Sequence, residues 1–162
     1  MSKILHLHGY KGSPNTNIIN WLRKMGFDVE GPAFDYDNEP NLFMDIVDKD
    51  FDFIIGNSLG AYIAYHVSKY KGIPAICINP PLYMDLALDI KLPLDITGNV
   101  QNFNIDVVVG MEDEVVDPLK VVTWLMENGE SSNLHMINGM GHNYGVDKFK
   151  EFAECIVAKW LI

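Results

Sequence analysis

The sequence has few basic residues for its length. It carries 12 lysines and arginines against 22 aspartates and glutamates, which gives a formal net charge of −10 over 162 residues. Nucleic acids and anionic membranes both bind basic protein surfaces, so this balance argues against either as a partner. It also disfavours highly anionic substrates, unless a local basic patch overrides the overall charge.

Cysteine is scarce as well, and long apolar runs are missing. The two cysteines, Cys77 and Cys155, lie in apolar stretches without the spacing of metal ligands, so we expect two buried, reduced thiols in a cytoplasmic protein. No run approaches the roughly 18 apolar residues of a membrane span. The apolar run at 4–9 is too short and too interrupted for a signal peptide.

Apolar stretches of strand length alternate with amphipathic stretches along the chain. We expect strands at 4–8, 27–34, 51–55, 73–79, 105–109 and 133–137, and helices at 15–25, 41–47, 59–70, 118–127 and 146–160. This alternation predicts an α/β fold, namely a doubly wound, mainly parallel six-stranded sheet with helices on both faces in three layers. The length favours one domain, 1–162, with one core.

The stretch from Phe51 to Ala64 combines an apolar strand, a tight turn and a helix, with Ser58 at the turn. Its centre, Gly56-Asn57-Ser58-Leu59-Gly60, fits Gly-x-Ser-x-Gly, the nucleophile-elbow pattern of α/β-hydrolases. An elbow holds its serine at positive φ, and glycines such as Gly56 and Gly60 let strand and helix approach closely around it. Taken alone, the pattern is equally consistent with an ordinary strand-to-helix turn.

Two further residues complete a candidate catalytic triad. A serine nucleophile needs a base, and the base needs an acid that orients it. Asp113 and His142 each follow a predicted strand, at the sheet edge where such folds carry their active sites. The order Ser58, Asp113, His142 is the order expected for this fold. Asp117 is the runner-up for the acid, although it is better explained as the cap of the helix that starts at Pro118.

The oxyanion hole of this fold combines two backbone N–H groups. We expect one from Leu59, directly after the nucleophile, and one from Tyr10, in the glycine-rich loop after the first strand. His6 and His8 in that strand also form His-x-His, a spacing used by metal-dependent hydrolases. A metal site would need a further ligand cluster, and the chain is too short for a (β/α)₈ barrel of about 250 residues. We therefore expect neither a metal nor another cofactor.

The segment 82–104 has no clear period and many leucines. It follows the fourth predicted strand, between the nucleophile and the acid, where a lid or an acyl pocket would be placed. Tyr83, Met84 and Leu86 are the candidate residues for lining a substrate pocket. Alternatively, these side chains only cover the sheet in place of a regular crossover helix, and both interpretations can hold together.

Several motifs together resemble the small YqiA/YcfP-like esterases of the α/β-hydrolase superfamily. They are Ile4-Leu5-His6-Leu7-His8-Gly9-Tyr10-Lys11-Gly12-Ser13-Pro14, Gly56-Asn57-Ser58-Leu59-Gly60-Ala61-Tyr62, Asn79-Pro80, Asp113-Glu114-Val115-Val116-Asp117 and Gly141-His142-Asn143. The resemblance implies esterase-type activity on carboxylic ester or thioester substrates, and it supplies no natural substrate. Asn57 departs from relatives that often carry another serine there. Small serine hydrolases of the retinoblastoma-binding type are a weaker resemblance.

These observations predict a cytoplasmic serine esterase or thioesterase that cleaves a small-molecule acyl ester or thioester through an acyl-enzyme on Ser58. The alternative is a non-catalytic binding module on the same fold, with the apolar 82–104 segment as its partner surface. An intact triad argues against that alternative, because a module that had lost catalysis need not retain all three groups. The sequence does not predict the oligomeric state.

Overall fold

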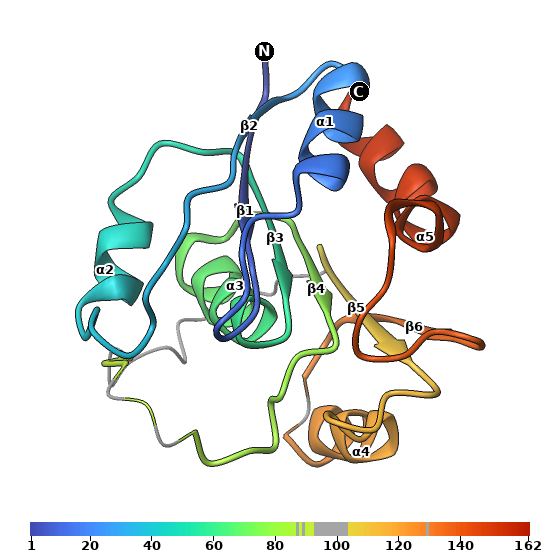
Figure 1. The fold of residues 1–162 in the computed structure, drawn as a ribbon. Helices are drawn as coiled ribbons and strands as arrows, with labels where there is room; N and C mark the ends of the chain where they lie inside the picture. Colours follow the sequence, from blue (N-terminus) through green and yellow to red (C-terminus); the bar gives the residue numbers. More distant parts are fainter. Residues whose placement is uncertain (87, 89, 93–103, 129) are drawn as a thin grey trace.

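The protein folds around one six-stranded sheet. The computed structural model describes residues 1–86, 88, 90–92, 104–128 and 130–162 (Figure 1). The sheet has the order β2-β1-β3-β4-β5-β6, and every neighbouring pair is parallel. The strands are β1 (Lys3–Leu7), β2 (Asp28–Glu30), β3 (Phe53–Asn57), β4 (Ala75–Ile78), β5 (Ile105–Gly110) and β6 (Asn133–Ile137). The predicted doubly wound α/β fold is therefore confirmed, with a sheet that is parallel in all its described pairs.

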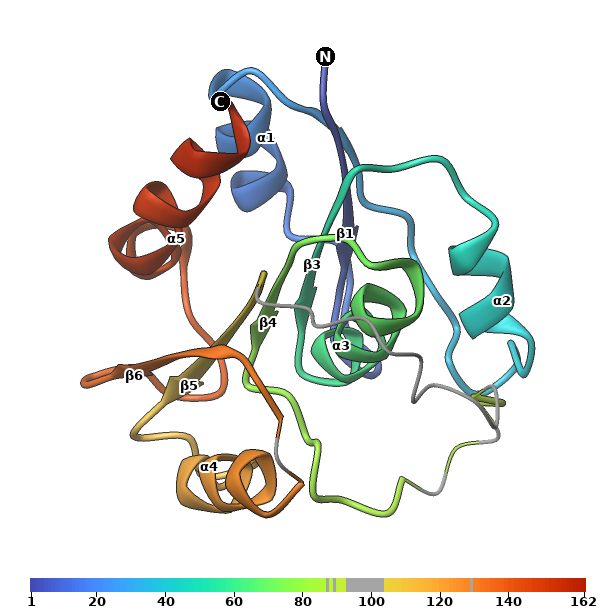
Figure 2. The ribbon, with the colours of Figure 1, turned by 180° about the vertical axis from the view of Figure 1, so that it is seen from behind.

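Five helices cover the two faces of this sheet in the described part of the chain (Figures 1 and 2). Helices α1 (Thr16–Lys24) and α5 (Val146–Trp160) share one apolar core with the sheet. Helices α2 (Leu42–Val47), α3 (Leu59–Lys71) and α4 (Pro118–Glu127) share the other. Successive side chains along a strand pack into the cores on opposite faces of the sheet, as those of Ile54 and Ile55 in β3 do. Both faces are buried, which explains the continuous apolar runs of the central strands.

The helix boundaries follow from local chemistry. Helix α1 begins where the Asn15 side chain accepts a hydrogen bond from the Ile18 N–H at 3.1 Å. Helix α3 ends at Gly72, whose φ of 70° lies in the left-handed region that glycine adopts without strain. Helix α4 begins with Pro118 at its first position, after Asp117 as cap.

Two expectations need correction. Strand β2 covers three residues rather than 27–34, because Gly31 and Pro32 follow Glu30 and proline has no N–H to donate to the next strand. Cys77 is buried, as expected, whereas Cys155 is exposed. The helical period of α5 places Cys155 on the outer face, although buried residues precede and follow it in the sequence.

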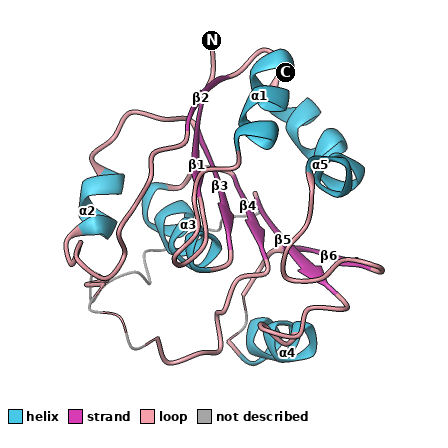
Figure 3. Ribbon diagram, viewed as in Figure 1, coloured by secondary structure: helices cyan, strands magenta, loops and turns pink. Residues whose placement is uncertain are grey.

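All strands end at the same edge of the sheet, and loops follow them there, except that β3 turns directly into α3 at Ser58 (Figure 3). The described part of the 82–104 segment contains neither helix nor strand, and residues 87, 89 and 93–103 lie outside the described residues. Its apolar side chains, including Met84, Leu86 and Leu88, are partly buried against the core that α2, α3 and α4 share. Among the described residues, no helix has both the length and the apolarity that crossing a membrane would require.

Candidate active site

Ser58 occupies a strained turn between β3 and α3. Its φ of 54° and ψ of −118° lie outside the regions that residues with a Cβ normally adopt. A Cβ on Gly60 would lie 2.5 Å from the Leu7 carbonyl oxygen, and one on Gly56 would collide with the Gly60 backbone. Two positions without Cβ therefore allow β3, α3 and the end of β1 to meet around Ser58.

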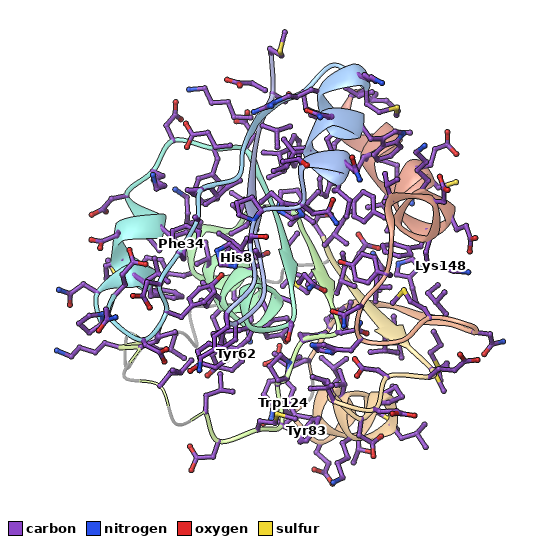
Figure 4. The ribbon with its side chains drawn as sticks, in the orientation of Figure 1. His8, Phe34, Tyr62, Tyr83, Trp124 and Lys148 are labelled. Atoms are coloured by element: carbon purple, nitrogen blue, oxygen red, sulfur yellow. The ribbon has the colours of Figure 1, made fainter. Side chains whose placement is uncertain are left out.

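The loop after β1 comes directly against this turn. A Cβ on Gly9 would lie 3.3 Å from the Ser58 Cβ, which is tight but not a collision. The His8 ring makes two hydrogen bonds that hold this loop. Its Nδ1 donates to the Gly9 carbonyl oxygen at 2.7 Å, and its Nε2 accepts from the Phe34 N–H at 2.8 Å (Figure 4). The Tyr36 hydroxyl donates to the His8 carbonyl oxygen at 2.5 Å. The position of Gly9 beside Ser58 is thus fixed by hydrogen bonds from the Phe34 N–H and the Tyr36 hydroxyl, which belong to a distant loop.

The same hydrogen bonds bear on the metal alternative at His6 and His8. A histidine binds a metal through the lone pair of an unprotonated ring nitrogen. In His8, Nδ1 donates and Nε2 already accepts, so this side chain has no lone pair left for a metal. Among the described residues, no cluster of three or more His, Cys, Asp or Glu side chains is arranged to hold a metal ion.

The residues of the two expected oxyanion donors, Leu59 and Tyr10, both lie beside the Ser58 turn. Leu59 is the first residue of α3, where backbone N–H groups have no partner within the helix and the helix dipole is positive. Tyr10 follows Gly9, and its hydroxyl donates to Asp37 Oδ1 at 2.8 Å. Tyr10, Ser58 and Leu59 line a common cavity.

His142 and Asp113 form a hydrogen-bonded pair at the sheet edge. His142 Nδ1 lies 2.8 Å from Asp113 Oδ2, and the Asp113 side chain is completely buried whereas His142 is 18% exposed. The other carboxylate oxygen of Asp113 accepts from the N–H groups of Val115 and Val116 at 2.8 and 2.9 Å. Since a carboxylate can only accept, Nδ1 carries a proton, and in the neutral form of the ring Nε2 has the free lone pair.

Asp117, the alternative acid, has a different role in the structure. Its Oδ1 accepts from the N–H groups of Leu119 at 2.9 Å and Lys120 at 3.4 Å, so it caps α4. Its own N–H donates to the Tyr83 hydroxyl at 2.9 Å, which holds Tyr83 beside α4 (Figure 4). The structure therefore brings Asp113, and not Asp117, to His142.

Asn79, to which the sequence assigned no role, ties the His142 loop to the sheet. It is buried at the end of β4 with a φ of 51°, and its Oδ1 accepts from the Gly110 N–H at 2.8 Å. Its amide group donates to the carbonyl oxygens of Gly141 and His142 at 3.2 and 3.4 Å. An asparagine before two prolines indicates a turn, but nothing in the sequence indicates a partner 62 residues further on.

Two cavities meet at Ser58. The first, about 270 Å³, contains Ser58 and His142 together with mostly polar residues, among them His6 and Asn57. The second, about 320 Å³, contains Ser58 and Leu59 with apolar residues, among them the expected pocket residues Met84 and Leu86. The third expected residue, Tyr83, lines neither of them and belongs to a separate hollow of about 650 Å³ at the start of α4.

His6 forms part of the polar cavity and is almost fully buried. Burial, and to a smaller extent the neighbouring His8, lowers the pKa of His6 to about 4, so its ring is neutral at physiological pH. Neither of its ring nitrogens, nor the Oδ1 of Asn57, has a hydrogen-bond partner among the described residues. The sequence indicated His6 only as a candidate metal ligand, and it gave no sign that the ring nitrogens of His6 and the Oδ1 of Asn57 are buried without hydrogen-bond partners in the described part of the chain.

Comparisons with known proteins agree with this architecture. The sheet order, the serine turn and the loops at one edge define an α/β-hydrolase-fold protein. More particularly, the chain belongs to the family described as Uncharacterised protein family (UPF0227), whose model matches residues 3–123. This match confirms the predicted resemblance to the YqiA/YcfP-like esterases.

Solved structures share the fold over almost the whole chain. A protein of the alpha/beta hydrolase superfamily from Xanthomonas campestris pv. campestris is 22% identical, with a TM-score of 0.67 over 99% of this chain and 98% of its own. A serine hydrolase without a lid from Xanthomonas campestris is 20% identical, with a TM-score of 0.67 over 97% and 82%. A thioesterase domain from the curacin biosynthetic pathway is 13% identical, with a TM-score of 0.70 over 96% and 91%. At these identities the likeness concerns the fold.

Proposed function

We propose that this protein is a serine hydrolase that cleaves a carboxylic ester or thioester through an acyl-enzyme on Ser58. One observation carries the proposal: His142 is hydrogen-bonded to the fully buried Asp113 and lines the same cavity as the strained Ser58. A neutral histidine with its Nδ1 proton held by a carboxylate presents a basic Nε2, which is what a serine nucleophile requires.

The proposed reaction has two halves. In acylation, Ser58 Oγ attacks the carbonyl carbon while His142 Nε2 takes its proton, and the resulting oxyanion accepts hydrogen bonds from the N–H groups of Leu59 and Tyr10. His142 then gives the proton to the leaving alcohol or thiol, and the carbonyl re-forms on Ser58. In deacylation, His142 takes a proton from a water molecule whose oxygen attacks the acyl carbon. His142 then gives that proton to Ser58 Oγ as the bond between Oγ and the acyl carbon breaks and the acid leaves.

Asp113 is the proposed acid of the triad because of how its two oxygens are used. One oxygen is fixed by two backbone N–H groups, which holds the carboxylate in place, and the other faces His142. An ionised carboxylate in this position favours the imidazolium that forms in each half-reaction. Structural neighbours support the reaction class, because they include a thioesterase domain and the esterase PE8.

The first experiment replaces the nucleophile. Ser58→Ala keeps the backbone strain and volume of the turn but removes Oγ, so we expect kcat/KM for nitrophenyl esters to fall by at least about 1,000-fold. A fluorophosphonate probe should modify wild-type protein at Ser58, as located by peptide mass spectrometry, and leave Ser58→Ala unmodified. Ser131→Ala, which removes an exposed serine before β6, is the matched control and should behave as wild type.

Full ester hydrolysis by purified Ser58→Ala would contradict the proposal. If the wild-type protein hydrolysed none of a panel of esters and thioesters, and the probe did not label Ser58, the non-catalytic binding module would be favoured instead.

A further inference from the structure

The two cavities that meet at Ser58 differ in chemistry, and this difference bears on the substrate. We infer that the substrate joins an apolar acyl group, held beside Leu86, to an uncharged leaving group that carries both hydrogen-bond donors and acceptors, held beside His142. The inference rests on the proposed hydrolase function and specifies the substrate class of the same site.

His142 decides which cavity receives the leaving group. The base of a serine hydrolase must return a proton to the leaving atom, so that atom lies within hydrogen-bond reach of the imidazole. His142 and the two residues that follow it line the polar cavity, and none of the three lines the apolar one. The leaving group therefore extends into the polar cavity, and the acyl group extends to the other side of Ser58.

The polar cavity favours a neutral group with hydrogen-bonding capacity. Its side chains are mostly hydroxyl, amide and imidazole groups, those of His6, Ser13, Asn15, Asn57, Asn143 and Tyr144. Among the described residues no lysine, arginine, aspartate or glutamate lines it, so an anionic leaving group finds no cation there and meets a protein of net charge −10.

The accessible lining of the polar cavity offers both hydrogen-bond donors and hydrogen-bond acceptors. The hydroxyl group of Ser13 and the amide group of Asn143 can each donate and accept. An apolar leaving group would take water from these groups without replacing its hydrogen bonds, whereas a polyol or an amide can supply both kinds of partner. Two sources share this chemistry: a hydroxylated alcohol and an amide-bearing thiol.

The apolar cavity suits an acyl chain of moderate length. Its walls are Pro81, Met84, Leu86, Leu88, Val115 and Val116. Its polar lining, apart from Ser58 itself, consists of Asp37 and the Tyr10 that donates to it. A volume of about 320 Å³ accommodates on the order of ten non-hydrogen atoms, if each takes the space of a water molecule.

Two matched sets of butanoyl substrates test the inference. The ester set has glycerol, 1-butanol or glycolate as the leaving group, and the thioester set has N-acetylcysteamine, butanethiol or mercaptoacetate. Each kcat/KM is divided by the rate constant for hydroxide hydrolysis of the same compound, which removes intrinsic reactivity. We expect the neutral polar member of at least one set to exceed both its apolar and its anionic counterparts at least tenfold. The set with the larger ratio identifies an alcohol or a thiol as the source.

Variants on the two sides of Ser58 assign the cavities separately. Tyr144→Phe removes one hydroxyl from the polar cavity and should lower the ratio of corrected kcat/KM values, neutral polar over apolar leaving group, at least threefold. Asn143→Leu replaces an exposed amide of the same cavity and should lower this ratio by a similar factor. Leu86→Trp narrows the other cavity and should shorten the preferred acyl chain in a series of nitrophenyl esters without changing the leaving-group ratio. Tyr70→Phe, the same change on the exposed face of α3, is the control and should alter neither preference.

Equal or better use of the butyl or anionic compounds would overturn the inference while the hydrolase proposal stood. An exchange of effects, with Tyr144→Phe changing chain-length preference and Leu86→Trp changing the leaving-group ratio, would overturn the assignment of the two cavities. Failure of every substrate together with an unlabelled Ser58 would overturn the hydrolase proposal itself.

Discussion

At the scale of single residues, two carboxylates four positions apart have unlike environments. Asp113 is completely buried and divides its oxygens between the backbone and His142. Asp117 uses its carboxylate on the first turn of α4. The contacts of each side chain, rather than its type or its distance from the strand, therefore separate the proposed acid from the helix cap.

A pair of identical substitutions tests this distinction. Asp113→Asn preserves volume and the oxygen that accepts from the backbone, but an amide N–H₂ facing His142 disfavours the tautomer with a free Nε2. We expect kcat/KM to fall roughly 10³- to 10⁴-fold with the far-ultraviolet circular dichroism unchanged. Asp117→Asn should stay within about threefold of wild type, because asparagine caps helices as well as aspartate does. A larger loss for Asp117→Asn than for Asp113→Asn would make Asp117 the acid.

At the scale of elements, the elbow depends on three backbone segments that meet without side chains between them. Strand β3 enters the turn and α3 leaves it, and the end of β1 lies against the first turn of α3 at Gly60. Because the end of β1 lies so close to α3, the loop that follows β1 comes to lie beside Ser58. The packing of backbone on backbone therefore both stabilises the sheet and positions the proposed oxyanion donors.

Gly60→Ala should separate these segments. The new Cβ would lie 2.5 and 2.6 Å from the carbonyl oxygens of Leu7 and His8, and backbone atoms cannot turn aside as a side chain does. We expect the free energy of unfolding in urea to fall by at least about 2 kcal/mol. Gly145→Ala is the matched control, because its Cβ meets nothing within 4 Å, and it should stay within about 1 kcal/mol. Equal stability of the two variants would show that β1 and α3 tolerate a Cβ between them.

The elements themselves follow from local signals, which is why the sequence predicts them well. Apolar periodicity, the asparagine before α1 and the proline that opens α4 act within a few residues of where they stand. The site depends on contacts across the fold, such as Asn79 with the His142 loop or the Tyr83 hydroxyl with the Asp117 N–H. The prediction that Cys155 is buried was wrong, because its apolar sequence neighbours lie on a different face of α5.

At the scale of the whole molecule, folding removes two histidine rings from water, that of His6 almost completely and that of His66 in part. Burial is the largest cause that lowers the pKa of His6 to about 4, with His8 adding to it. Burial likewise lowers the pKa of His66 in α3 to about 4, with Lys69 adding to the effect and Glu130 opposing it. Both side chains titrate near 6.5 in the unfolded chain, so folding and proton binding oppose each other at mildly acid pH.

Stability should therefore fall as the pH is lowered from 6.5 to 4. In this window the unfolded chain binds a proton at His66 that the folded protein does not, and below the folded pKa of about 4 no further loss arises from this residue. Each histidine contributes a loss of up to about 3 kcal/mol, less for His66 because its ring is partly exposed. Urea unfolding at a series of pH values measures the slope, and His66→Gln should be less steep than wild type. Tyr70→Phe, on the same helix, leaves His66 in place and should keep the wild-type slope. An unchanged slope in His66→Gln would mean that His66 is protonated equally in the folded and unfolded chain.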